Sequence, residues 1–201
     1  MQNKVAEELR RQLRSYERAR ARSELLLQQN GLRKSDVLFV YDALLLRSVC
    51  AFEAFLEKLF VSILLDKCSY AKSRVTPRVT FSSSRVLWAV LLGGQDYLQW
   101  LPYDRTVKRA ESFLRGGRPF TQLGATQIDD LRNAYRVRNA VAHPSSHAQR
   151  VFHEKVLAGL TLPPRERTTA GFLRSVVRIN PRIRRLQIYM RMLDSTARAL
   201  V

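Results

Sequence analysis

The sequence predicts an all-α fold, a helical bundle with long central helices. Apolar side chains recur at intervals of three and four residues along several stretches, the spacing that places them on one face of a helix. The 201 residues include only 8 Gly and 7 Pro, so long segments are free of helix breakers. An apolar share of 46% is ordinary for a globular chain. The length suits one domain with a substantial core, although it would also fit two small domains.

The first predicted helix spans residues 3–29 and is amphipathic and basic. Its apolar face carries Val5, Leu9, Leu13 and Tyr16. Gly31 supplies a stop. The other faces are rich in arginine, which suits a solvated surface or a ridge that contacts RNA. We therefore divide the chain into residues 1–30, a basic helix packed on the domain, and residues 31–201, the helical domain itself.

The second predicted helix is the most apolar and should form the centre of the bundle. Ser35 or Asp36 can cap its start, and it is expected to run to about Lys67. Charged residues interrupt its apolar run, and charges at bilayer depth are costly. These are Asp42, Arg47, Glu53, Glu57 and Lys58. A buried core helix is therefore favoured over a membrane span.

Cysteine usage favours a cytoplasmic protein without a zinc site. Cys50 and Cys68 would lie about 27 Å apart along a continuous helix, too far for a disulfide. We expect both to be reduced, buried thiols. No CxxC pair, no HExxH motif and no signal-peptide pattern is present, and we predict neither a metal nor another cofactor.

Shorter helices are expected along the rest of the chain. Residues 75–84 contain Pro77 and should form a loop, followed by helices over about 84–92 and 104–115 that end at paired glycines. A further helix is expected over about 146–157. Pro181 should open the final helix.

The chemically interesting helix is predicted to run from a cap at Thr126 to His143. Pro144 disfavours helical geometry at the residue before it, so the helix should end at or near the histidine. On a helical projection, one polar face spans about 80°. It carries Asp129, Arg132, Arg136, Asn139 and His143. Such a stripe suits phosphodiester binding, and it would also serve as an ordinary solvated face.

Arg138 breaks this pattern, because it projects into the apolar arc, about 140° from His143. An arginine there must reach solvent, pair with a buried acid or lie at an interface. Asp42 and Glu53 are the candidate partners, because they fall on nearly the same face of the second helix.

The charge balance indicates anionic partners. Lys and Arg number 35 against 17 Asp and Glu, a net charge of +18, and 28 of the cations are arginine. Guanidinium binds two phosphate oxygens at once, so nucleic acid is the first candidate, ahead of an acidic protein or a membrane surface. A GC-rich genome that inflates arginine is the alternative explanation.

The motif Arg138-Asn139-Ala140-Val141-Ala142-His143 resembles the R-N-x-x-x-H form of the Rx4–6H motif of HEPN domains. Residues 42–60 are similar to the long core helix of the RiboL-PSP-HEPN group, and residues 171–193 to its closing helix. The resemblance thus extends over about residues 36–193. The E-x3-K element of some HEPN toxins is absent, because Glu57 follows Glu53 at the lysine position.

This resemblance implies a HEPN-like bundle that dimerises through the motif helix, and metal-independent cleavage of RNA in toxin–antitoxin or antiphage settings. An antitoxin or another defence protein is then a possible partner. The family also contains members that only bind RNA or a protein, so a catalytically inactive module is the main alternative. A third hypothesis is that the protein is a scaffold in a larger defence complex.

The residues suit ribonuclease chemistry without a metal. His143 can take the proton of the 2′-hydroxyl, since imidazole titrates near neutral pH. Arg138 can bind the phosphate as negative charge builds up, and Asn139 can orient the ring or the phosphate. Arg132 and Arg136 are candidate RNA-binding residues. A single histidine leaves the departing 5′-oxygen without an acid, which a second His143 in a two-fold homodimer would supply.

Overall fold

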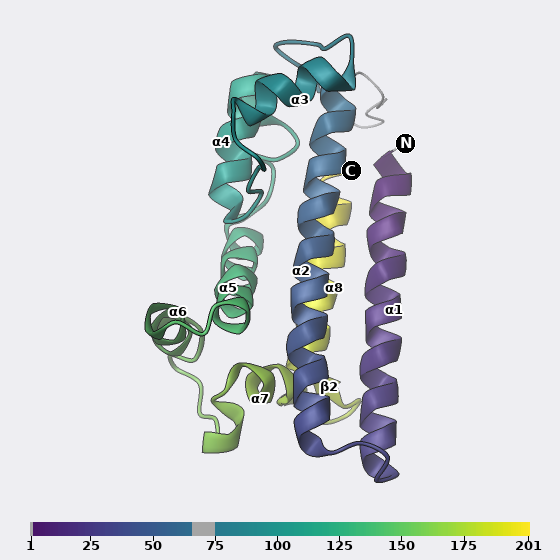
Figure 1. Ribbon diagram of the computed structural model, residues 1–201, viewed down its shortest axis with the longest axis vertical. Helices are drawn as coiled ribbons and strands as arrows, with labels where there is room; N and C mark the ends of the chain where they lie inside the picture. The colour runs from purple at the N-terminus through teal and green to yellow at the C-terminus, as the bar shows by residue number, and fades with distance from the viewer. Residues whose placement is uncertain (1, 66–74) are drawn as a thin grey trace.

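The computed structural model describes residues 2–65 and 75–201, and over these residues the chain is an α-helical bundle with one small hairpin. Helices α1 (Gln2–Gln28) and α2 (Lys34–Leu64) are antiparallel neighbours, and α8 (Arg185–Ala199) packs against both. Figure 1 shows α2 between α1 and a second group of helices that contains α4 (Tyr103–Phe113) and α5 (Ala125–Ala142). The predicted all-α class is confirmed.

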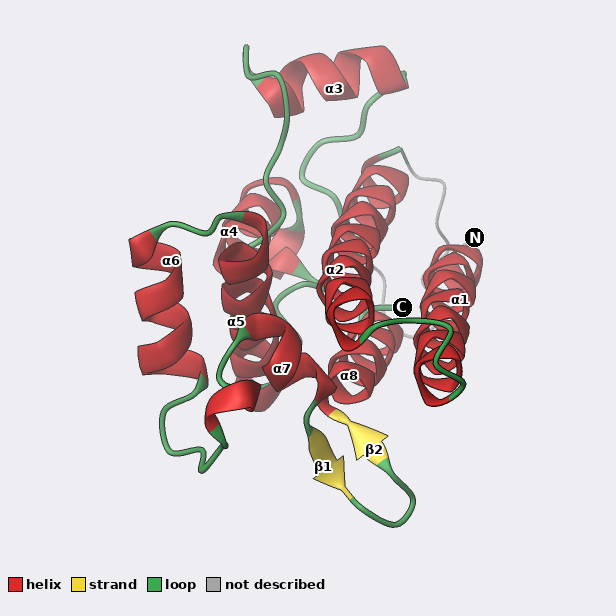
Figure 2. Ribbon diagram, turned by 60° about the horizontal axis from the view of Figure 1, so that its bottom comes forward, coloured by secondary structure: helices red, strands yellow, loops and turns green. Residues whose placement is uncertain are grey.

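Smaller elements cover the ends of this bundle. Helix α3 (Ser84–Leu92) crosses one end, while α6 (Ser146–Val151) and α7 (Thr169–Arg174) lie toward the other (Figure 1). Strands β1 (Val176–Arg178) and β2 (Ile183–Arg184) form an antiparallel hairpin beside α7 (Figure 2). Short 3₁₀ turns occupy Arg115–Gly117 and Pro164–Glu166, and a π-helical turn, Phe152–Val156, extends α6.

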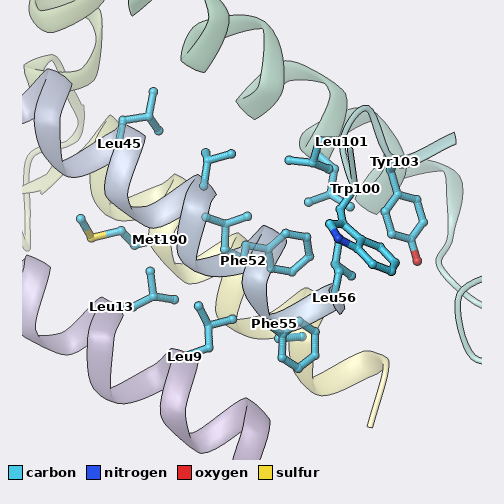
Figure 3. Packing of buried hydrophobic residues seen from close by; sticks show 14 of the residues in the cluster. Leu9, Leu13, Leu45, Phe52, Phe55, Leu56, Trp100, Leu101, Tyr103 and Met190 are labelled. Atoms are coloured by element: carbon cyan, nitrogen blue, oxygen red, sulfur yellow. The ribbon is translucent and has the colours of Figure 1, made fainter. Parts of the chain in front are cut away.

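Helix α2 supplies the centre of the hydrophobic core, as its composition predicts. Phe52, Phe55 and Leu56 are buried between Leu9 and Leu13 of α1 on one side and the segment before α4 on the other (Figure 3). Burial of each such side chain is worth about 1.5–3 kcal/mol. Rings of Phe60, Trp100, Phe113 and Phe120 pack edge-on or tilted at the end of α2 near α4. This aromatic contact fixes the segment before α4 against α2.

The helix boundaries match the predictions in several places. Helix α1 ends as expected before Gly31, whose N–H donates to the Leu26 carbonyl, after Asn30 has turned into the left-handed region. Helix α3 begins after Ser83, whose hydroxyl accepts a hydrogen bond from the Val86 N–H. Helix α5 ends at His143, as the following proline predicts. None of the described helices is long and apolar enough to span a membrane.

Three predicted helix starts are wrong: neither Ser35 nor Asp36 is the N-cap of α2, Thr126 is not the N-cap of α5, and Pro181 does not open the last helix. Gly124, not Thr126, is the N-cap of α5, and its own N–H donates to the Gln127 side chain. Pro181 lies in the turn of the β-hairpin, and α8 begins only at Arg185. At the start of α2, Arg33 is the N-cap and Asp36 accepts its N–H at 2.9 Å.

The expectation of buried thiols is wrong for Cys50, which lies on the solvent-facing side of α2 and is exposed. Cys68 and the predicted helix end near Lys67 lie outside the described residues.

Candidate functional site

Helix α5 is held on the bundle by a narrow stripe of small and aliphatic side chains. Its buried residues are Leu131, Ala134, Val137 and Ala140. Arg138 and Asn139 lie beside this stripe and are half-buried. They therefore stand at the edge where α5 meets its neighbours, and not in the middle of a packed face.

His143 is the residue at which the helix ends. Its N–H still donates to the Asn139 carbonyl at 2.8 Å, but its φ of −130° and ψ of 93° are extended. The side chain is exposed. The helical projection placed Arg138 and His143 on different sides, and the extended geometry at His143 removes that separation.

A hollow of about 600 Å³ brings the three motif residues together. Helix α5 contributes Tyr135, Arg138, Asn139 and His143 to its lining. Helix α2 contributes Glu53, Ala54 and Glu57, and the segment before α4 contributes residues 97–101. The predicted catalytic set thus lies in one concave site.

The Arg138 guanidinium makes fewer hydrogen bonds in this hollow than it has N–H donors. Its Nη1 donates to Asn139 Oδ1 at 3.2 Å, while its Nε is buried and has no hydrogen-bond partner among the described residues. A buried unsatisfied donor costs free energy, more so on a charged group. An anion in the hollow would instead accept from the accessible Nη groups and neutralise the charge, and phosphate matches the planar geometry of the guanidinium.

Glu53 is the acid that the structure brings to Arg138. Burial raises the pKa of the Glu53 carboxyl above its ordinary value, and the Arg138 charge and the Leu101 N–H partly offset this effect. Both residues line the same hollow. The charges of Glu53 and Arg138 are therefore close enough to interact, although among the described residues no ion pair of 4 Å or less joins their side chains. The pairing suggested by the sequence stays a prediction.

The second candidate acid, Asp42, does not pair with Arg138. Its Oδ2 accepts a hydrogen bond from the Thr169 hydroxyl at 3.4 Å, and its Oδ1 is buried with no partner. Burial raises the pKa of Asp42 to about 6, against the lowering effect of Thr169. Asp42 and Glu53 share a helix face but lie about 16 Å apart along its axis, so they cannot reach the same guanidinium.

Arg132 and Arg136 do not line the hollow. Arg132 pairs with Asp129 on its own helix and lies 3.8 Å from the Asp104 carboxylate. Arg136 donates to Asn133 Oδ1 at 2.9 Å. The predicted polar stripe is therefore divided into the residues at the hollow and these two arginines, which are engaged with neighbours.

Several lining residues could not be identified from sequence. Trp100 donates from Nε1 to Glu57 Oε2 at 2.9 Å, and the Thr106 hydroxyl donates to the Trp100 carbonyl. These bonds fix the segment of Tyr97 and Gln99 against α2. The spacing of Glu53 and Glu57, one helical turn apart, was the only available signal, since residues 97–101 show no periodicity.

Comparison with protein-family models, with curated proteins and with solved structures finds no match to this chain. Among residues 2–65 and 75–201, no three His, Cys, Asp or Glu side chains are grouped so that they could hold a metal ion. The interpretation of the site thus depends on its geometry and on the motif.

Proposed function

We propose that the chain is a HEPN-type endoribonuclease that cleaves RNA without a metal and leaves a 2′,3′-cyclic phosphate and a 5′-hydroxyl. The observation that carries this proposal is the shared hollow: a half-buried Arg138, whose guanidinium is incompletely satisfied, and an exposed His143 line one concave site. An unsatisfied cation suits a phosphate, and a neighbouring imidazole suits proton transfer.

In the proposed reaction His143 takes the proton of the 2′-hydroxyl. The 2′-oxygen then forms a bond to phosphorus, and the bond from phosphorus to the 5′-oxygen breaks. Arg138 stabilises the negative charge on the non-bridging oxygens. Asn139, whose Oδ1 accepts from Arg138, keeps the guanidinium in place, and Glu53 supports it from α2.

The departing 5′-oxygen takes a proton, and we propose that His143 of a second copy supplies it. An exposed histidine at a helix end is accessible to another chain, and a two-fold axis would place two such residues at one composite site. The proposed protein is thus a cytoplasmic homodimer. A toxin or antiphage role, restrained by an antitoxin or a defence partner, fits an RNA-cleaving enzyme of this kind.

The test is cleavage of total RNA by the purified protein in EDTA, with analysis of the product ends. The variant His143→Ala should lose about 10²- to 10⁴-fold of the rate. His147→Ala is the matched control. His147 is exposed, and its ring Nδ1 lies 3.4 Å from Arg150 Nη2, outside the hollow. We expect it to cleave like the wild type.

Three outcomes would contradict the proposal. Products with 5′-phosphate ends, or equal cleavage by His143→Ala, would exclude the 2′-hydroxyl mechanism. Intact RNA with all three proteins, together with retained RNA binding, would identify the chain as a catalytically inactive RNA-binding module.

A further inference from the structure

A second hollow of about 430 Å³ adjoins the candidate site. Tyr97 and Gln99 line both hollows, so the connection between α3 and α4 forms their shared wall. Figure 1 shows this connection returning from α3 alongside α4. A ligand that fills the first hollow can therefore continue into the second across Tyr97.

Tyr97 occupies this wall with most of its ring in solvent. Its side chain is 68% exposed, and its hydroxyl accepts a hydrogen bond from Gln99 Nε2 at 3.5 Å. Single exposed aromatic residues are ordinary on protein surfaces, and exposure alone says little. A ring between two polar hollows, one of which carries a phosphate-binding motif, is placed to stack on a nucleic-acid base.

Two arginines of α4 form the far side of the second hollow. The Arg109 guanidinium lies 4.6 Å from the centre of the Trp100 ring, and its Nη1 donates to the Gln99 carbonyl at 3.2 Å. Burial lowers the pKa of Arg109, the charge of Arg105 lowers it further, and Glu57 opposes both effects. Arg105 itself is exposed.

Among the described residues, no carboxylate forms an ion pair of 4 Å or less with either of these two arginines, Arg105 and Arg109. Asp96 is the one acid of the lining, against two arginines. The hollow therefore has a net positive charge and suits an anionic group.

We propose that this second hollow binds the RNA segment next to the cleaved phosphate, with Tyr97 stacking on a base and Arg105 and Arg109 binding a backbone phosphate. The identity of the ligand as RNA rests on the proposed function. The order of contacts is a consequence of the geometry: phosphate at Arg138, base at Tyr97, then phosphate at the arginines of α4.

The first experiment measures binding of a fluorescein-labelled single-stranded RNA decamer by anisotropy, with the full-length protein in EDTA and a 2′-deoxy substitution that blocks cleavage. Tyr97→Ala should weaken binding about tenfold, because stacking is worth about 1–3 kcal/mol per base. Tyr97→Phe keeps the ring and should bind like the wild type. Equal affinity of the alanine and phenylalanine variants would overturn the stacking role.

The second experiment measures the same affinity across a range of salt concentrations. Arg105→Gln should reduce the slope of log affinity against log salt by about 0.7, the value for one phosphate contact in a single strand. Arg11→Gln removes the same charge from an exposed position on α1, beyond α2, and should leave the slope unchanged. Equal changes in the two variants would mean that only the overall charge matters, and would overturn the proposed phosphate site.

Failure of this inference can be told apart from failure of the proposed function. Normal cleavage with unchanged binding by Tyr97→Ala and Arg105→Gln would reject the second hollow alone. No cleavage by the wild type, combined with the expected losses of binding, would reject the enzyme and keep the binding site.

Discussion

Arginines in two regions of this protein have different surroundings. Near β2, the Glu24 carboxylate accepts from Arg174 at 2.8 Å and from Arg184 at 2.9 Å, and the Tyr41 hydroxyl donates to it at 2.8 Å. At the hollow, the Arg138 Nε is buried without a partner. The arginines of the first region have a carboxylate partner, whereas the guanidinium of Arg138 is incompletely satisfied.

The difference separates a structural cluster from a site for a ligand. Burial opposes ionisation of Glu24, but hydrogen bonds from Arg174 and Tyr41 and the charges of both arginines outweigh it and lower its pKa. The cluster ties α1 to the C-terminal part of the chain and gives both arginines a counter-charge. At the hollow, burial without sufficient partners raises the pKa of Glu53 instead. Natural proteins accept such a local cost where binding or catalysis requires it.

Between the two arginine regions, the largest effect should follow from Arg138→Gln. Because the guanidinium is proposed to stabilise charge that develops in the transition state, its loss should reduce the RNA cleavage rate by about 10²- to 10³-fold. The substitution removes the unsatisfied Nε but also removes the cation near Glu53, and because these effects oppose each other we expect a small net change in the free energy of unfolding. Single-turnover cleavage and urea unfolding measure the two quantities, with Arg136→Gln as the control on the same helix.

A loss of activity that merely follows a loss of folded protein would contradict this prediction. So would an Arg138→Gln variant that cleaves as fast as Arg136→Gln, because the two positions would then be equivalent.

The second effect concerns the saturated cluster. Glu24→Gln should lower the free energy of unfolding by about 3 kcal/mol, because two partly buried guanidinium groups lose their counter-charge. Glu7→Gln is the control, since the Glu7 side chain is 53% exposed and its pair with Arg10 should be worth well under about 1 kcal/mol. Urea unfolding at neutral pH checks both values. Equal losses would mean that the cluster is no more important than a surface ion pair.

The sequence predicted the motif side of this contrast, but not the Glu24 cluster and not the geometry of the hollow. Apolar periodicity predicted α1, α2 and α5, and the R-N-x-x-x-H motif with its proline predicted where α5 ends. The misplacement of Arg138 relative to His143 arose because a projection assumes helical geometry to the last residue. Glu24 and its arginines were missed because they are brought together from opposite ends of the chain, and no local pattern marks such a contact.

The candidate site was also predicted only in part, because the fold brings some of its residues together from distant parts of the chain. Residues 97–101 lie in an irregular connection whose position depends on the bond between Trp100 and Glu57. The β-hairpin of residues 176–184 was missed because its strands are too short for alternation to be recognised.

The third effect is a change with pH in the free energy of unfolding, caused by the Asp42 carboxyl. Its folded-state pKa of about 6 lies above the ordinary value near 4, so between these pH values the folded protein holds a proton that the unfolded chain has released. Stability from this group should therefore fall as pH rises from about 4 to about 6. Glu24, with a lowered pKa, has the opposite sign: its contribution is lost as pH falls.

Asp42→Asn should abolish this loss and stabilise the protein at pH 7 by about 2 kcal/mol, because the amide carries no charge to bury. Urea unfolding of the variant and the wild type between pH 4.5 and 7.5 measures the difference. The two curves should meet toward the acidic end. A constant difference across the whole range would show that Asp42 does not titrate in it.

The smallest effect is expected for Arg132→Gln, which tests whether all arginines of α5 contribute to RNA binding. The Arg132 side chain is 38% exposed and already pairs with Asp129, so a phosphate would compete with an existing ion pair. We expect less than about a twofold loss of RNA affinity, compared with a larger loss for Arg105→Gln, whose guanidinium has no carboxylate partner. Anisotropy with the labelled decamer measures both variants side by side. A loss for Arg132→Gln as large as that for Arg105→Gln would mean that RNA binds along the polar stripe of α5, and that the ion pairs of an arginine do not decide whether it is available to RNA.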